Sequence, residues 1–364
     1  PHHEEEVARI GAGPSRSGPR SPAMPRVIGI DPGTVSIDLC GLDQGQVWLD
    51  RSLPTREALQ HPDTFLDLLR ADRPPDLIAG PSGYGLPLVR ADQATDRDLR
   101  LAFLAPDGEV GGIGGLRRLA RLLAESELPV VYTPGVIHLP SVPEHRKLNR
   151  VDLGTADKVA AAALAIWDQV RRFGGSPSHT SFLLLELGGA FTAVLAVDQG
   201  AIVDGIGGSS GPIGWQSSGA WDGEVAFLAG TVGKDLLFQG GAAASGAAGM
   251  LAYVEGALKA ALALTAAVPA PREIFLSGRH ATEPAILAGL VPRLSSIAPV
   301  VPLKGFATVA KAGAQGAALI ADGLAGGEQR GLLETLGLRK ASGTVLDYLR
   351  VISPETARRR IGID

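Results

Sequence analysis

The sequence predicts an α/β protein made of two related domains, each with a mixed five-stranded sheet, and a cleft between the domains. Three observations lead to this prediction. Segments with strand and helix periodicity follow one another in the same order twice, and a glycine turn follows the first strand of each copy. A hydrophobic content of 45% over 364 residues is sufficient for two cores.

The first copy begins with three short runs of alternating apolar residues, which predict an antiparallel meander. Helical spacing then alternates with short apolar runs that predict buried strands. The predicted segments are strands 27–31, 35–42 and 46–53, helix 56–70, strand 76–80, helices 99–104 and 116–125, strand 129–133 and helix 153–172.

The second copy repeats this order, apart from a long glycine-rich insertion after its third strand. Its predicted segments are strands 181–187, 190–198 and 201–206, helix 250–267, strand 274–277, helix 283–294, strand 298–301 and helix 307–325. We therefore divide the chain into a leader, an N-terminal domain, a connecting helix, a C-terminal domain and a helical tail, over residues 1–23, 24–152, 153–179, 180–325 and 326–364.

The two ends of the chain carry no predicted chemistry. The leader has almost no large apolar side chain to offset the entropy of ordering, so we expect it to be disordered and Met24 to be the natural start. The tail is expected to form short helices around Leu332 and over residues 345–351.

Composition and charge limit the classes of binding partner and the location that we expect for this protein. A net charge of −4 gives no reason to expect nucleic acid, and the single cysteine, Cys40, excludes an intramolecular disulfide and indicates a reducing, cytoplasmic location. Charged residues and glycines interrupt the apolar runs, so we expect no membrane-spanning segment. The seven histidines lack the spacing of a zinc site, and the sequence has no Walker loop. A homodimer is left open.

The turn after the first strand combines residues suited to binding a phosphate. Asp31 ends the strand and can hold a hydrated Mg²⁺ against an oxyanion, while Gly33 lets a ligand approach the backbone and Thr34 offers a hydroxyl and an N–H. On its own, this pattern is equally typical of a hairpin whose aspartate caps the turn.

The second copy repeats the turn, with Glu186 shortly before Gly188 and Gly189. Two acidic residues at equivalent turns would face each other across a cleft, which predicts a clamp for a nucleoside triphosphate and its Mg²⁺. The metal would contact Asp31 and Glu186 through water.

Five motifs resemble the superfamily of acetate and sugar kinases, heat-shock ATPases and actin. GIDPGT and ELGGAFTAVLAVDQGAIVDGIGG resemble its two phosphate motifs, GTADKVAAAALAI and KAGAQGAALIADGL its two connecting motifs, and IFLSGR its adenosine motif, all in the superfamily's order. The resemblance implies duplicated ribonuclease H-like (actin-like ATPase) domains that bind ATP and Mg²⁺ in an interdomain cleft. More narrowly, NRVDLGTADK and GWQSSGAWDGE resemble an uncharacterised prokaryotic family of predicted butyrate kinases.

The resemblance also implies roles for individual residues. Asp157 would be the acidic residue that orients metal-bound water, although it could also be a surface charge beside Lys158. Glu186 stands where the superfamily usually has aspartate. The predicted nucleotide site combines the adenosine motif with the glycines and threonine of the two turns: Ser277, Gly278, Arg279, Gly33, Thr34, Gly188 and Gly189.

The small residues of the two connecting motifs suggest how their helices pack. Gly313 and Gly316 weaken a helix interior unless close packing requires them, so we expect the connecting helices to approach closely and to shift as the cleft closes.

The basic residues of the sequence give one indication of the class of phosphoryl acceptor. A carboxylate acceptor is already ionised at neutral pH and needs cations to hold it beside a phosphate. The segment PEHRKLNRVD supplies four basic candidates just before the connecting helix, His145, Arg146, Lys147 and Arg150. A solvated basic loop is the alternative explanation.

Two loops are candidates for the acceptor pocket, residues 82–88 and 207–224. In the second loop, Trp215 and Ser217 could line a pocket for a short acyl chain, or Trp215 could anchor the loop. Asp222 could serve as the base that a hydroxyl acceptor requires. The arginine that acetate kinases place in a comparable loop has no counterpart here.

Three functions therefore stay open. The leading hypothesis is a Mg-ATP-dependent kinase that phosphorylates a small carboxylate and forms an acyl phosphate, with butyrate as the working acceptor. The alternatives are a kinase of a sugar or other hydroxyl, and an ATP-dependent sensor or assembly factor without a small acceptor.

Overall fold

The structure, a computed structural model, describes residues 24–33, 35–80, 83–105 and 112–363. The predicted leader 1–23, the predicted phosphate ligand Thr34 and Ser82 of the predicted acceptor loop lie outside the described residues.

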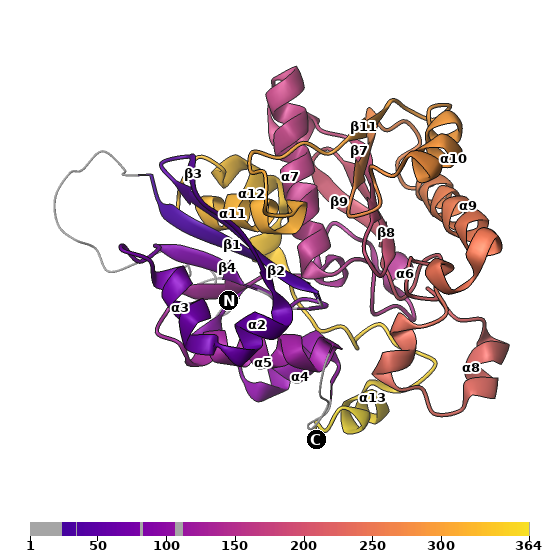
Figure 1. The fold of residues 1–364 in the computed structure, drawn as a ribbon, viewed down its shortest axis with the longest axis horizontal. Helices are drawn as coiled ribbons and strands as arrows, with labels where there is room; N and C mark the ends of the chain where they lie inside the picture. Colours follow the sequence, from indigo (N-terminus) through magenta and orange to yellow (C-terminus); the bar gives the residue numbers. More distant parts are fainter. Residues whose placement is uncertain (1–23, 34, 81–82, 106–111, 364) are drawn as a thin grey trace.

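The first sheet contains six strands in the spatial order β3-β2-β1-β4-β6-β5. Figure 1 labels its strands β1 to β4. β1 pairs antiparallel with β2 and parallel with β4, β2 pairs antiparallel with β3, and β4 pairs parallel with β6. The strands are β1 (Arg26–Pro32), β2 (Ser36–Asp43), β3 (Gln46–Pro54), β4 (Leu77–Gly80), β5 (Val89–Arg90) and β6 (Val130–Tyr132).

The second sheet contains five strands in the order β11-β10-β7-β8-β9. β7 pairs antiparallel with β8 and parallel with β10, while β8 pairs antiparallel with β9 and β10 pairs parallel with β11. The strands are β7 (Phe182–Leu187), β8 (Thr192–Asp198), β9 (Ala201–Ile206), β10 (Glu273–Ser277) and β11 (Val300–Pro302). β1 and β7 therefore hold equivalent places in their sheets, and the predicted duplication is confirmed.

The edge strand β5 departs from the prediction of two five-stranded sheets. It pairs antiparallel with β6 through Val89 opposite Tyr132 and Arg90 opposite Val131. A strand of two residues has no periodicity that a sequence could show, because its pairing arises only when the preceding loop returns to the sheet edge.

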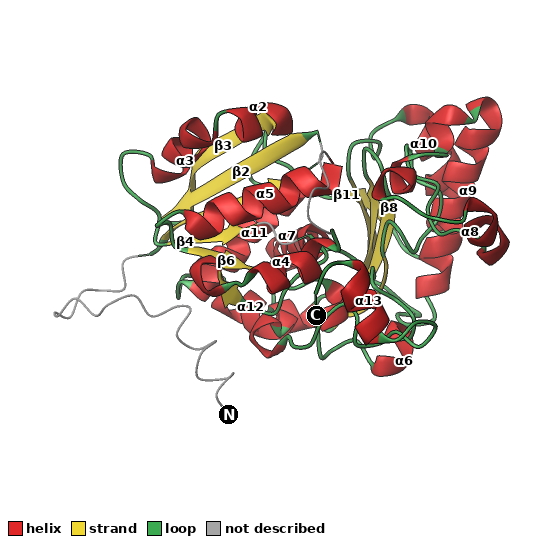
Figure 2. Ribbon diagram, turned by 90° about the horizontal axis from the view of Figure 1, so that it is seen from below, coloured by secondary structure: helices red, strands yellow, loops and turns green. Residues whose placement is uncertain are grey.

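The helices and the two sheets form five layers (Figure 2). α2 to α5 cover the outer face of the first sheet, α9 and α10 cover the outer face of the second, and α7 and α11 lie between the sheets. The helices are α2 (Thr55–Gln60), α3 (Pro62–Arg70), α4 (Asp96–Phe103), α5 (Gly112–Glu125), α6 (Glu144–Lys147), α7 (Ala156–Phe173), α8 (Gly223–Ala229), α9 (Gly246–Leu264), α10 (Pro284–Leu294), α11 (Ala312–Leu324), α12 (Arg330–Leu336) and α13 (Pro354–Arg360).

The last helix of each copy is held by the sheet of the other copy. α11 follows the second copy in the sequence but packs on the first sheet, where a Cβ added at Gly29 of β1 would lie 2.1 Å from the backbone nitrogen of Ala318. α7 follows the first copy and reaches the second sheet, where Gln169 donates to Glu273 of β10 at 2.8 Å. Because each helix packs on the sheet of the other copy, the two helices join the two halves.

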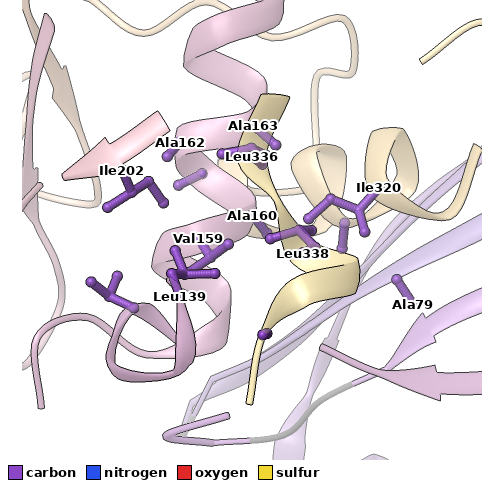
Figure 3. Packing of buried hydrophobic residues seen from close by; sticks show 14 of the residues in the cluster. Ala79, Leu139, Val159, Ala160, Ala162, Ala163, Ile202, Ile320, Leu336 and Leu338 are labelled. Atoms are coloured by element: carbon purple, nitrogen blue, oxygen red, sulfur yellow. The ribbon is translucent and has the colours of Figure 1, made fainter. Parts of the chain in front are cut away.

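α7 and α11 meet at backbone distance. A Cβ added at Gly316 of α11 would lie 1.7 Å from the carbonyl oxygen of Ala160 in α7, so only glycine fits there. Around α7, the same core collects Ala79 from the first sheet, Ile202 from the second and Leu336 from α12 (Figure 3). The close approach predicted from the small residues is therefore present.

Two predicted helices have different bounds in the structure. The helix predicted over 56–70 is two helices, α2 and α3, because Pro62 has no N–H to donate and disfavours a helical conformation at the residue before it. The last predicted helix of the second copy begins at Ala312 rather than at residue 307. Asp50 of β3 accepts the N–H groups of residues 308–310 instead, at 2.7 to 3.2 Å, and so holds them in a loop.

The tail forms α12 and α13, and the helix predicted over 345–351 is replaced by turns. The side-chain oxygen of Asn149 accepts the N–H groups of Arg350 and Val351, at 2.7 and 3.0 Å. These two N–H groups therefore serve a contact with a distant loop rather than a helix, which local periodicity does not reveal.

The expectation that no segment is long and apolar enough to cross a membrane is wrong for α9. Its 19 residues meet both criteria with a mean hydropathy of 1.4, because only Glu255 and Lys259 carry charge. The helix nevertheless packs on the second sheet through one buried face that includes Tyr253, Ala257 and Ala261. Length and composition are therefore weak grounds for a membrane span here.

Replacing Gly316 by alanine tests the contact between α7 and α11. We expect the free energy of unfolding to fall by about 3 kcal/mol, because the added methyl group collides with the backbone of α7. The control is Gly331→Ala in α12, where nothing lies within 4 Å of the added Cβ; helix propensity should make that variant more stable by about 1 kcal/mol. Urea denaturation measures both, and equal stability of Gly316→Ala and wild type would show that the helices separate without cost.

Candidate active site

A cleft of about 780 Å³ opens between the two halves. It is lined by the ends of β1, β7 and β10 and by the first turns of α7 and α11. Because β1 and β7 are equivalent strands, the duplication brings Asp31 and Glu186 to the same cavity, together with Gly33, Gly188 and Gly189.

The two turns share one hydrogen-bond geometry. The N–H of Gly33 donates to the carbonyl of Ser36 at 2.8 Å, and the N–H of Gly188 donates to the carbonyl of Phe191 at 3.0 Å. A Cβ on either glycine would lie 2.8 Å from the carbonyl oxygen that its own N–H contacts. Both N–H groups are thus engaged within their turns, so these two glycines provide close approach to the backbone rather than free N–H donors.

An ion-paired cluster lies in the middle of the cleft. Asp157 stands in the first turn of α7 and accepts a short hydrogen bond from the hydroxyl of Thr155. The Nζ of Lys158 donates to Asp157 at 2.7 Å and to Glu186 at 2.6 Å, which ties α7 to the end of β7. Sequence reasoning assigned no role to Lys158, although its position beside Asp157 in the first turn of the connecting helix is a signal that could have been used.

Burial and mutual charge set the pKa values of this cluster. Burial raises the pKa of Asp31 to about 7, and the charge of Asp157 adds to the rise, whereas Lys158 and Lys311 oppose it. Burial also acts to raise the pKa of Asp157, but the Lys158 ammonium and the Thr155 hydroxyl outweigh it and hold that pKa below its ordinary value. At neutral pH the cluster therefore contains ionised Asp157 beside a partly protonated Asp31.

Gly313 of α11 makes room for the Asp31 carboxylate. A Cβ added at Gly313 would lie 2.5 Å from Oδ2 of Asp31, and the Asp31 side chain is only 9% exposed. The glycine-rich start of α11 thus lets a buried carboxylate stand at the phosphate turn.

The acidic residues suit a hydrated cation better than a directly ligated one. Within the described ranges, no group of three histidine, cysteine, aspartate or glutamate residues converges closely enough to hold a metal ion. Mg²⁺ commonly keeps several waters and binds through one or two carboxylates plus substrate phosphates. Asp31 and Glu186, on opposite sides of the cleft, fit that mode.

The predicted adenosine motif lines the cleft beside the second turn. Ser277 pairs with Glu186 in parallel register at the end of β10, and Ser277, Gly278 and Arg279 all line the cavity. Gly278 has φ of 94°, and a Cβ there would lie 2.5 Å from the carbonyl oxygen of Leu187. The chain can therefore turn away from the strand only with glycine at this position.

Four aromatic side chains also line the cleft, and we refer to them as its aromatic end. Tyr84 and Phe103 from the first half face the cavity, as do Phe191 and Phe238 from the second, with the last two rings 5.1 Å apart. Lys234 reaches across from the insertion of the second half, with its Nζ 3.5 Å from the carbonyl oxygen of Phe103. Sequence reasoning missed Phe103, Phe191 and Phe238, because they come from separate segments that only the fold brings together.

The four basic candidates for acceptor binding do not line the cleft. Arg146 donates to the carbonyl of Val203 at 2.6 Å and pairs with Asp204 at 3.5 Å. Lys147 is buried, donates to the carbonyl of Leu139 at 2.8 Å and lies over the ring of Tyr348. His145 and Arg150 belong to the same short segment around α6, so this basic loop fastens β9 and the tail.

In the loop 207–224, Gly208, Ser209 and Gln216 line the cavity, but the three candidates Trp215, Ser217 and Asp222 do not. Trp215 stacks on His280 at 4.5 Å and contacts Tyr253, so it anchors the loop to α9. Ser217 is buried and its hydroxyl accepts the N–H of Gly219. Asp222 is exposed and caps α8, and this helix lies at the periphery of the molecule in both views (Figures 1 and 2).

Fold and cleft together define a two-half α/β protein with the fold of acetate kinases. The structure resembles a propionate kinase from Francisella tularensis subsp. tularensis SCHU S4, with a TM-score of 0.56 and 11% identity over 80% of this chain and 99% of that chain. It also resembles acetate kinases from Entamoeba histolytica and Porphyromonas gingivalis, each with a TM-score of 0.53 over 77% of this chain and 96% of the other, at 10% and 13% identity. At such identities the likeness shows the fold alone.

By sequence, the chain belongs to the family described as "Protein of unknown function (DUF1464)", which matches residues 29–351. No curated protein matches the chain. The predicted actin-like ATPase fold is confirmed by the solved structures, and the narrower resemblance to predicted butyrate kinases stays a prediction.

Replacing Asp31 by asparagine tests the electrostatics of the cluster. The folded-state pKa of about 7 lies above the ordinary value of 3.8, so wild type loses stability as pH rises from about 4 to 7, the interval in which the unfolded chain has already released the proton. The asparagine amide has no proton to release in this interval. We expect Asp31→Asn to gain stability over wild type with rising pH, by up to about 4 kcal/mol.

Urea denaturation at pH 5 and pH 8 measures this difference. Asp50→Asn is the control, because four hydrogen bonds from the 308–310 loop outweigh burial and lower the pKa of Asp50. The change in stability caused by Asp50→Asn should therefore be the same at both pH values. A difference between Asp31→Asn and wild type that does not change with pH would contradict the burial of a high-pKa carboxylate.

Proposed function

We propose that this chain is a kinase that uses Mg-ATP to phosphorylate a small carboxylic acid with an apolar body, with butyrate as the working acceptor. The observation that carries the proposal is that one cleft is lined by the glycine turns and adenosine motif (named the glycine-lined end), by Asp31, Asp157 and Glu186 (the acidic middle) and by four aromatic rings (the aromatic end). Its volume of about 780 Å³ falls within the range of sites for small ligands, roughly 300–1,000 Å³.

The glycine-lined end suits a nucleotide. Ser277 and Gly278 close β10 at its carboxyl edge, where open α/β sheets bind ligands. Arg279 follows directly, and its Cδ lies 3.6 Å from where a Cβ of Gly189 would be, so the guanidinium stands beside the second turn. With adenosine at Gly278, the phosphates would lie between the turns, near Arg279.

The acidic middle suits the metal that accompanies ATP. Asp31 and Glu186 would hold a hydrated Mg²⁺ through water, and the ion would supply positive charge that neutralises the triphosphate. The raised pKa of Asp31 means that binding the ion would release a proton below pH 7.

The aromatic end suits the body of an acyl chain. Four rings, those of Tyr84, Phe103, Phe191 and Phe238, line it, and such rings suit the apolar body of a short acid. The shared fold with proteins named acetate kinase and propionate kinase also supports a short acid.

Transfer to a carboxylate needs no base. One carboxylate oxygen attacks the γ-phosphorus, the bond from that phosphorus to the β,γ-bridging oxygen breaks, and ADP leaves with the electron pair. The total charge is conserved, because a carboxylate and ATP become an acyl phosphate and ADP without release of a proton.

Asp157 favours a second candidate function, transfer to a hydroxyl. Its carboxylate lies in the cleft and its low pKa keeps it ionised, so it could accept the proton that an attacking hydroxyl must lose. Asp157 would then hold the role that the sequence suggested for Asp222, which lies outside the cleft.

Trapping with hydroxylamine tests the acceptor class. We expect acids of three to six carbons to accelerate ATP turnover and to yield hydroxamates, because hydroxylamine captures acyl phosphates. Asp222→Ala should leave these rates unchanged. Turnover that responds only to sugars or alcohols would instead favour the hydroxyl acceptor, and turnover that responds to neither would contradict a small-molecule kinase.

Replacing Phe238 by alanine tests the acyl pocket. Removing this ring from the aromatic end should shift the preference toward longer acids, by about tenfold in the ratio of kcat/KM for hexanoate to that for butyrate, since each methylene in such a pocket is worth about 1 kcal/mol or more. Phe227→Ala is the matched control, because Phe227 belongs to the same insertion but is 78% exposed on α8. An unchanged ratio in Phe238→Ala would remove Phe238 from the acceptor site.

A further inference from the structure

Lys158 holds a central place among the positive charges of the cleft. Of the described residues that line the cavity, three carry a positive charge, Lys158, Arg279 and Lys311. Lys311 is paired with Asp38 at 2.7 Å and donates to the hydroxyl of Ser36 at 2.5 Å, which fixes it beside the first turn. Arg279 stands beside Gly189 of the second turn, so among these three Lys158 is the one that pairs with Asp157 and Glu186.

Lys158 also occupies the space in which a cation would be drawn to the carboxylates. Its Nζ bridges Asp157 and Glu186, and the charge of Asp31 acts on it as well. Three carboxylates around one ammonium leave an excess of negative charge even when Asp31 is protonated. In the ligand-free protein, the ammonium therefore does part of what a metal ion would do.

Arrival of a metal with the nucleotide changes this balance. The carboxylates would then share a divalent charge, and the triphosphate would bring several negative charges into the same space. A lysine ammonium is a compact charge on a flexible stem, so it can exchange one anionic partner for another by rotation of the side chain.

We propose that Lys158 is a catalytic residue that exchanges partners, from Asp157 and Glu186 in the free protein to the γ-phosphoryl oxygens of bound ATP. This inference rests on the proposed function. The ammonium stabilises the charge that spreads over the phosphoryl oxygens while the acceptor oxygen bonds to phosphorus and the bond to the bridging oxygen breaks. It holds its proton throughout and adds no atom to the product.

The environment of Lys158 is consistent with a fixed charge. Burial acts to lower its pKa, but Asp157 and Glu186 raise it further, to above the ordinary range of lysine. The side chain therefore serves as a permanent cation and not as an acid or base.

Nucleotide binding tests the proposal without a measurement of turnover. Lys158→Met should weaken binding of the β,γ-imido analogue of ATP relative to ADP by about tenfold, because only the analogue has the γ-phosphoryl group. Calorimetry with both nucleotides in Mg²⁺ gives this ratio. Lys259→Met, which removes an exposed lysine of α9, should keep the wild-type ratio.

A second measurement uses the free protein. Because Lys158→Met leaves Asp157 and Glu186 without their ammonium, Mn²⁺ alone should bind about tenfold more tightly than to wild type, as seen by electron paramagnetic resonance. Turnover should fall by about 100-fold. Lys158→Arg, which retains the charge, should recover part of the nucleotide ratio; if Lys158→Met does not fold, Lys158→Gln takes its place in both measurements.

The nucleotide-binding results distinguish the proposed kinase function from the proposed role of Lys158. If wild type binds neither nucleotide, the proposed function fails and the inference fails with it. If wild type binds both nucleotides and Lys158→Met keeps the same ratio between them, the kinase stands but Lys158 is only a structural ion pair.

Discussion

The crossing of α7 and α11 at backbone distance is the constraint on which the rest of the structure depends. Gly316 lies against the carbonyl of Ala160, and Gly29 of β1 lies against the backbone of α11. Side chains larger than hydrogen at these points would push the two sheets apart. The same helices carry Asp157 at the start of α7 and Gly313 beside Asp31, so the contact that joins the halves also sets the distances between the charged groups of the cleft.

Those charged groups are held in a state that favours a ligand over the empty cleft. Burial alone acts against ionised Asp31 and Asp157, and the single charge of Lys158 compensates only part of the negative charge of the cluster. A protein that needed only stability would replace such a cluster with apolar side chains. Its presence at the ends of two equivalent strands fits a site whose missing positive charge arrives with the substrate.

The aromatic end of the cleft shows how an insertion can form a pocket that the repeated core lacks. Phe191 follows the second turn, but Phe238 belongs to the insertion after β9, and Lys234 of that insertion contacts Phe103 of the first half. The insertion thus bridges the two halves beside the cleft. By contrast, the basic side chains around α6 contact β9 and the tail. Their positive charge therefore gave a misleading indication of an anion site.

The sequence by itself determined the duplication, the two acidic turns and the close approach of the connecting helices. These features rest on local order and residue type: strand and helix periods repeat, and glycine is required wherever two backbones touch. Tertiary structure alone decided the partners of Lys158, the edge strand β5, the tail conformation and the four rings of the aromatic end. Each of these depends on contacts between segments far apart in the chain, and charge or aromaticity in one segment does not reveal which distant group will meet it.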